Sequence, residues 1–102
     1  VNASGEASKG GLAPGVVPDF AREIAPLPGL RLRGLMTIIE NTDDAARQRA
    51  QFRVVRERFE ELRNNGIAVD TLSMGMSQDF RPAIEEGATM VRIGSAIFGA
   101  RA

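Results

Sequence analysis

The chain alternates short apolar runs with amphipathic segments, and this alternation constrains its fold more than any other feature. Apolar runs at 30–39, 69–74 and 89–94 predict strands, and a strand end is expected at the start of the chain. Segments with helical periodicity lie between them, at 14–27, 42–65 and 80–86. Strands that alternate with helices form a parallel sheet with crossover helices. The predicted fold class is therefore α/β.

Two of the predicted helices begin at residues suited to capping. Thr42 precedes two aspartates, so its hydroxyl is expected to cap the helix at 42–65 while the carboxylates face the positive end of the helix dipole. Asp79 is the expected cap of the helix at 80–86, because Pro82 then falls in the first turn.

The size of the chain suggests part of a larger barrel. Four strands in 102 residues amount to half of a (β/α)8 TIM barrel, whose usual length is roughly 250 residues. A small open α/β sheet competes with this interpretation, but such a sheet usually opens with a complete strand. We therefore expect 1–102 to be one partial domain, a fragment that forms the C-terminal half of the barrel, about strands 5–8. Its two sheet edges and apolar inner face would need another half, or self-association with another copy, to cover them.

Composition excludes several classes of function. Thirteen basic and 13 acidic residues give a net charge of zero, which argues against nucleic-acid or anionic-membrane partners. The chain has no Cys and no His, so we expect no zinc site of the usual kind, no disulfide, no thiol nucleophile and no Ser-His-Asp relay. No apolar run approaches the roughly 20 residues that cross a bilayer. A soluble cytoplasmic protein is expected.

Small and hydroxyl residues gather where two neighbouring predicted strands end. The segment 69–77 puts Ser73 and Gly75 before the start of a helix, and the next strand ends in Gly94 and Ser95. Free amides, hydroxyl groups and a helix N-terminus can hold one anion together, and in (β/α)8 enzymes the loops after the last two strands are a frequent phosphate site. The sequence therefore predicts a phosphate site at these strand ends.

Side chains alternate along a strand, which assigns the candidate residues to faces. If Ser73 points into the barrel, Thr71 and Val69 share its face, and Leu72 packs outward on the helices. The opposite arrangement is equally consistent with the sequence.

Three charged residues lie near the predicted site or in the first loop. Arg92 interrupts an apolar run, and a guanidinium inside a barrel is costly unless it meets an anion; the alternative is that it pairs with Asp79 or Glu40. Glu40 itself is either a general base or a solvated edge residue. Lys9, the only lysine, lies three residues after Glu6, so we expect it to be solvated or ion-paired rather than to form a Schiff base.

Four segments resemble a known family, the pyridoxal 5′-phosphate homeostasis proteins, also called YggS-like proteins or proline synthetase co-transcribed homologues. They are VNASGEASKGG at 1–11, LRLRGLMTI at 30–38, DTLSMGMSQDFRPAI at 70–84 and VRIGSAIFGAR at 91–101. The pairing of LSMGMS with VRIGSAIFG is specific, and the resemblance covers the whole chain.

The resemblance implies a barrel like the N-terminal domain of alanine racemase. It would hold pyridoxal 5′-phosphate (PLP) and affect vitamin B6 and amino-acid balance without demonstrated catalysis, so no catalytic residue is expected. By this similarity, Ser73 and the amides of Gly94 and Ser95 would hold the phosphate, and Arg92 would face the pyridine nitrogen. Met74 and Gly75 would line the site. An arginine beside that nitrogen keeps it unprotonated and weakens the ring as an electron sink, which suits a carrier better than a transaminase.

The family's Schiff-base lysine sits near the end of the first barrel strand, so it is expected outside this fragment. Lys9 matches the lysine of the E-x-x-K-x-G loop and does not inherit that role. Two alternatives stay open. One is a PLP-dependent, racemase-like enzyme, which would need a second acid or base such as a tyrosine, and the chain has none. The other is a barrel that binds another phosphorylated metabolite.

Overall fold

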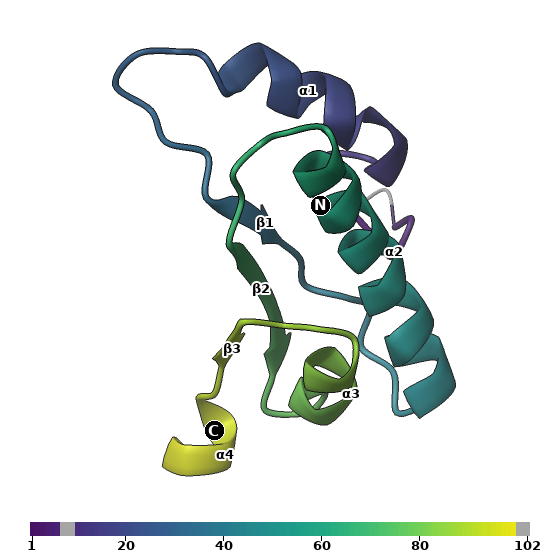
Figure 1. Ribbon diagram of the computed structural model, residues 1–102. Helices are drawn as coiled ribbons and strands as arrows, with labels where there is room; N and C mark the ends of the chain where they lie inside the picture. The colour runs from purple at the N-terminus through teal and green to yellow at the C-terminus, as the bar shows by residue number, and fades with distance from the viewer. Residues whose placement is uncertain (7–9, 100–102) are drawn as a thin grey trace.

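The computed structural model describes residues 1–6 and 10–99, which form one parallel sheet with helices packed on one side (Figure 1). The strands lie in the order β1-β2-β3 and are β1 (Gly34–Met36), β2 (Thr71–Met76) and β3 (Met90–Arg92). The helices are the 3-10 turn η1 (Pro14–Val16), α1 (Val17–Ile24), α2 (Ala45–Asn64), α3 (Phe80–Glu85) and α4 (Ser95–Phe98). The predicted α/β class with parallel strands is confirmed.

The strands are shorter than the apolar runs that predicted them. The run at 30–39 contributes only Gly34–Met36 to the sheet. No strand forms within residues 1–6, where a strand end was expected, although this segment runs beside the end of β1. There the Val1 backbone nitrogen donates to the Met36 carbonyl, and the Thr37 hydroxyl donates to the Val1 carbonyl, both at 2.7 Å.

The predicted cap of α2 is wrong, whereas that of α3 is confirmed in position but lacks a capping hydrogen bond. Asp44 caps α2, because its Oδ1 accepts from the amides of Ala46 and Arg47 at 3.0 and 3.3 Å. Thr42 stands two residues before this cap, and its hydroxyl accepts from the Asp44 amide instead. Asp79 stands at the N-cap position of α3, but its carboxylate accepts from the Met76 amide at 2.7 Å, so it closes the preceding turn rather than capping the helix.

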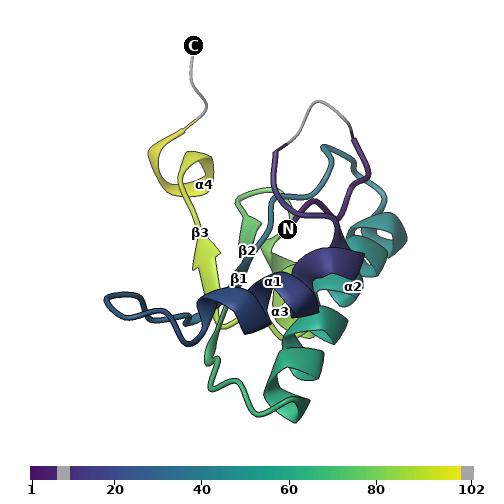
Figure 2. The same ribbon diagram turned by 90° about the horizontal axis from the view of Figure 1, so that it is seen from above.

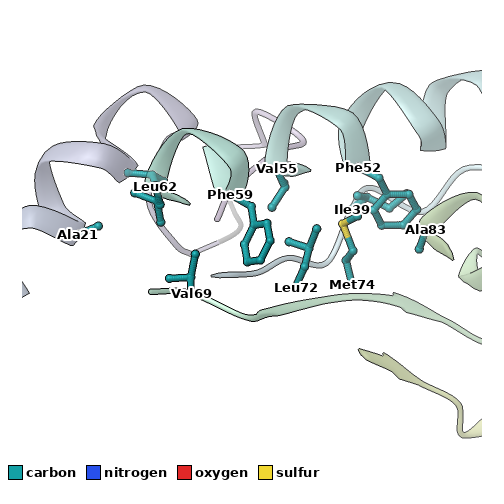
Figure 3. Packing of buried hydrophobic residues seen from close by; sticks show 11 residues of the cluster. Ala21, Ile39, Phe52, Val55, Phe59, Leu62, Val69, Leu72, Met74 and Ala83 are labelled. Atoms are coloured by element: carbon teal, nitrogen blue, oxygen red, sulfur yellow. The ribbon is translucent and has the colours of Figure 1, made fainter. Parts of the chain in front are cut away.

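The core lies between α2 and the sheet, as Figure 3 shows. Apolar side chains recur along one stripe of α2 and meet Leu72 and Met74 from β2. Thr71 and Ser73, which alternate with them, are half-buried on the other face. The residues of the core are Val17, Ala21, Ile39, Phe52, Val55, Phe59, Leu62, Val69, Leu72, Met74 and Ala83. Leu72 therefore packs on the helices, as in the first arrangement considered above.

Val69 does not share the face of Ser73, contrary to that arrangement. It is 5% exposed and belongs to the core. The reason is that Val69 precedes the first residue of β2, and its amide donates to the Ile67 carbonyl at 2.9 Å in a local turn. The alternation of a strand does not reach back to it.

The other face of the sheet, here called the open face, is not covered by any helix of the described residues (Figures 1 and 2). The register places Met36, Ser73 and Met90 side by side across the three strands. Met36 and Met90 are about half exposed, at 45% and 51%. The open face is thus apolar, with Ser73 in the middle of one row.

A buried carboxylate fixes α3 to α2. Glu86 follows α3 and is buried, and its carboxylate accepts from Arg53 Nε and Nη2 at 3.2 and 3.1 Å and from Arg49 Nε at 3.3 Å. Hydrogen bonding to Arg53 is the main cause that lowers the pKa of Glu86, against the opposing effect of desolvation. Arg56 completes the contact by donating to the Glu86 carbonyl at 3.1 Å.

Candidate functional site

A hollow of about 750 Å³ lies at the carboxyl ends of the strands. The residues that line it lie at or beyond the ends of all three strands. They are 38–42 after β1, 76–79 at the end of β2 and beyond, Arg92, Gly94, Ser95, Phe98 and Gly99 at the end of β3 and beyond, and Gln48 of α2. In parallel α/β sheets, ligands bind at this end of the strands.

Two backbone amides converge on one oxygen at the edge of the hollow. The amides of Gly94, the N-cap residue of α4, and of Ala96, in its first turn, donate to Ser77 Oγ at 3.2 and 3.0 Å. Ser77 follows the end of β2, so the contact joins two neighbouring strand ends. Amides that point to one place form a site for an anionic oxygen. Here Ser77 Oγ takes that place, and because it accepts from both amides its own hydrogen is left to donate. The arrangement can therefore hold an oxyanion such as a phosphate oxygen.

Arg92 adds a positive charge beside these amides. It is the last residue of β3, and its Nη2 lies 3.9 Å from Met36 Sδ, across the open face. Within residues 1–6 and 10–99 it forms no ion pair. The alternative prediction that Arg92 pairs with Asp79 or Glu40 is wrong, because each carboxylate is engaged elsewhere: Asp79 with the Met76 amide, and Glu40 with side chains of α2.

Glu40 closes one wall of the hollow but is not a free base. Its carboxylate forms an ion pair with Arg47 and accepts from Gln51 Nε2 at 3.0 Å. It is therefore not the solvated edge residue that the sequence suggested, since its side chain is only 19% exposed. Lys9 lies outside the described residues.

The residues predicted from the sequence fall in three places. Arg92, Gly94 and Ser95 line the hollow. Ser73 lies on the open face, three residues before the end of β2, and does not line the hollow. The Met74 side chain is 1% exposed and belongs to the core, on the face opposite Ser73.

Gly75 is buried and serves the packing of α3 on the sheet. Its φ is +108°, and a Cβ at this position would lie 2.8 Å from Ala83 Cβ and 3.0 Å from Val91 Cγ1. The register between β2 and β3 shifts between Ser73 and Met76, around this glycine. This shift ends the regular alternation of side chains between the two faces of β2, and Ser77 is the first residue after it.

Sequence reasoning missed Ser77 as a contact of the amides, although it included this residue in the strand-end segment. Ser73 was preferred there, but β2 continues to Met76. The position of Ser77 in the sequence could have identified it, because it is the first hydroxyl residue after the last residue of β2 and reaches the turn that follows β3. In the described ranges, no cluster of three or more His, Cys, Asp or Glu could hold a metal ion, and no helix is long and apolar enough to cross a membrane.

Comparisons with known sequences agree with the motifs. The "Pyridoxal phosphate homeostasis protein" of Pseudomonas aeruginosa is 55% identical over 101 residues, which are 99% of this chain and 43% of that protein. The protein of the same name from Escherichia coli K12 is 46% identical, with the same coverage of each chain. The resemblance inferred from the motifs is confirmed. The chain spans less than half the length of these curated relatives.

Solved structures match the fold closely. A crystal structure of an unknown protein from Bifidobacterium adolescentis has a TM-score of 0.91 at 40% identity and covers 96% of this chain and 40% of that one. PipY of Synechococcus elongatus, solved with PLP bound, has a TM-score of 0.81 at 31% identity and covers 94% of this chain and 47% of PipY. The family described as "Alanine racemase, N-terminal domain" matches residues 2–102. This chain belongs to the alanine racemase N-terminal domain family.

Proposed function

We propose that this chain binds PLP at the strand-end hollow and takes part in PLP and amino-acid homeostasis in the cytoplasm. The observation that carries the proposal is the convergence of the Gly94 and Ala96 amides on Ser77 Oγ, close to Arg92, which has no ion-pair partner in the described residues. The names of the relatives and the PLP bound to PipY support the choice of ligand.

The donors in the hollow suit a phosphate monoester. The amide and hydroxyl of Ser95 and the hydroxyl of Ser77 would donate to phosphate oxygens. The amides of Gly94 and Ala96, which donate to Ser77 Oγ in this structure, would do so once the Ser77 side chain rotates away. The Ser73 hydroxyl would contribute a hydrogen bond to the ligand from the open face. Met74 and Gly75 would contribute only their backbone, which leads to Ser77.

Arg92 would set the protonation of the ligand's ring. A guanidinium is always protonated and can only donate hydrogen bonds, so a ring nitrogen beside it must accept and stay unprotonated. When bound, PLP supplies an electron sink for carbanions, and this sink is weaker with an unprotonated ring nitrogen. We therefore infer a non-catalytic carrier rather than a racemase-like enzyme. The lysine that attaches PLP covalently would belong to polypeptide outside residues 1–102.

We also infer that the sheet is the C-terminal half of a (β/α)8 barrel, about strands 5–8. The chain exposes 6595 Å² of surface, whereas a folded monomer of its mass exposes about 5,600 Å². The excess of roughly 1,000 Å² is similar to the area of about 800 Å² that one partner buries in a standard protein interface. Either the other half of the barrel or self-association with a second copy would cover the open face. Light scattering of the purified chain distinguishes a monomer from a dimer.

A PLP titration tests the function. Absorbance is followed for the 102-residue chain and for a longer version that restores the upstream sequence, and borohydride reduction with mass spectrometry locates any trapped pyridoxyl group. We expect the longer version to bind and to carry the group on an upstream lysine. Modification at Lys9 would overturn the assignment of the lysine. Failure of both versions to bind would assign the hollow to another phosphorylated metabolite.

Variants of the longer version test the residues. Arg92→Ala is expected to weaken PLP binding about tenfold through the loss of a charge-assisted hydrogen bond. The matched control is Arg31→Ala, because Arg31 is exposed and precedes β1, at the other end of the strands. Equal affinity of the Arg92 and Arg31 variants would contradict the role of Arg92.

A further inference from the structure

The wall of the hollow formed by residues 38–42 has no regular secondary structure. Its backbone is held instead by two glutamine side chains of α2. The Glu40 amide donates to Gln51 Oε1 at 3.1 Å, and Gln48 Nε2 donates to the Thr42 carbonyl at 2.6 Å. The two glutamines stand three residues apart on α2, so they lie on the same side of the helix.

Gln51 holds Glu40 by both of its polar groups. While its Oε1 accepts from the Glu40 amide, its Nε2 donates to the Glu40 carboxylate at 3.0 Å. Arg47, one turn earlier on α2, pairs with the same carboxylate. The Gln51 Nε2 group also makes a long contact of 3.4 Å with the Arg47 carbonyl of its own helix. Gln51 is therefore directed at the wall.

Because the two glutamine side chains are buried, losing their hydrogen bonds would cost free energy. Gln48 and Gln51 are 6% and 8% exposed, and Gln51 precedes Phe52 of the core. A buried amide that loses its partners costs free energy because water does not replace them. An apolar residue would fill such a position at no polar cost, so the glutamines are best explained by what they bind.

We propose that Gln51, through Glu40, and Gln48, through the Thr42 carbonyl, are positioning residues that fix the wall 38–42 opposite Ser77 and the Gly94–Ala96 amides. They set the width of the hollow and hence the fit of its ligand. The identity of that ligand rests on the proposed function, whereas the anchoring of the wall does not.

A charge exchange between the two partners tests this proposal. Gln51→Glu places a second carboxylate against Glu40 and removes the donor between them. The double variant Glu40→Gln with Gln51→Glu restores the pair, because the new amide at position 40 donates to the new carboxylate at position 51, and Arg47 can pair with position 51 one turn along α2. Glu57→Gln, on the exposed side of α2, is the matched control.

Two readouts are taken on each variant: amide hydrogen exchange at residues 40–42, and PLP affinity of the longer version described above. For Gln51→Glu we expect exchange about tenfold faster and PLP affinity about tenfold weaker. The double variant should return both to within about twofold of the original protein, and Glu57→Gln should change neither. Thermal unfolding is measured in parallel, because a merely structural role would lower the melting temperature without a change in affinity.

The two proposals fail differently. If the original protein does not bind PLP, the proposed function is lost, and the exchange data alone decide whether the glutamines anchor the wall. Unchanged exchange in Gln51→Glu would overturn the inference whatever the ligand. So would faster exchange that leaves PLP affinity at its original value.

Discussion

Replacing Glu86 by glutamine tests whether the buried carboxylate between α2 and α3 stabilises the fold. The Glu86 side chain is 10% exposed and accepts three hydrogen bonds from Arg49 and Arg53. Glutamine has nearly the same shape and keeps one acceptor oxygen, but it removes the charge and turns the second oxygen into a donor that faces the guanidinium groups. The substitution therefore perturbs the electrostatics with little change in packing.

The expected loss follows from the exposure of the two partners. Hydrogen bonds to a charged group contribute about 1.5–3 kcal/mol, against about 0.5–1.5 kcal/mol for neutral pairs. The side chains of Arg49 and Arg53 are 44% and 56% exposed, so solvent screens the interaction and rehydrates them once the carboxylate is gone. We expect Glu86→Gln to lower the free energy of unfolding at neutral pH by about 1–2 kcal/mol. Glu85→Gln is the control, because the Glu85 side chain is 55% exposed and only approaches Arg49 at 3.5 Å.

The effect should depend on pH with a definite sign. The pKa of Glu86 is lowered in the folded protein, mainly by the hydrogen bond from Arg53. Its contribution to stability is therefore complete above the ordinary pKa of a glutamate and is lost as the pH falls through the lowered value. Urea unfolding, followed by circular dichroism, is measured for both proteins at neutral pH and at about pH 3. A difference in unfolding free energy that is the same at both pH values would refute the reasoning.

Three further predictions concern stability. Gly75→Ala should cost about 1–3 kcal/mol, because it adds a close contact with Ala83 to an unfavourable φ; Gly29→Ala, with φ +82° and no neighbour within 4 Å, should cost less, and equal losses would exclude the contact as a cause. Leu62→Ala should cost about 2.7–5 kcal/mol by leaving a cavity, and Leu30→Ala, whose side chain is 63% exposed, should be nearly neutral in the same denaturation assay. Asp44→Ala should cost about 1 kcal/mol through the lost cap of α2, whereas Thr42→Ala should cost less; the reverse order would restore Thr42 as the cap.

The order and type of the elements could be predicted because they follow from local periodicity. The extent of β1 could not, since the pattern at 30–39 stays compatible with a strand from its alternating start to its apolar end. The chain leaves the sheet after Met36 because Glu40 and Thr42 are bound by Gln51 and Gln48, and such side-chain contacts leave no trace in a hydrophobic pattern.

The candidate site shows the same division. Arg92, Gly94 and Ser95 could be placed from the end of their strand. Choosing between Ser73 and Ser77 required the irregular register around Gly75, which depends on how closely α3 approaches the sheet. Glycine can adopt the positive φ found at Gly75, but a glycine in the sequence does not require one.

The methionines of the open face bear on how this surface tolerates change. Met36 and Met90 flank Ser73, and their unbranched, polarizable side chains can adjust to differently shaped neighbours. A polypeptide that covers them does not need a rigid, complementary surface, so the seam between the two layers can accept substitutions on either side. The strand-end hollow is built differently, because the Gly94 and Ala96 amides at its edge belong to the backbone and are kept by every substitution except proline. Side chains can therefore vary along the open face without affecting these two donors.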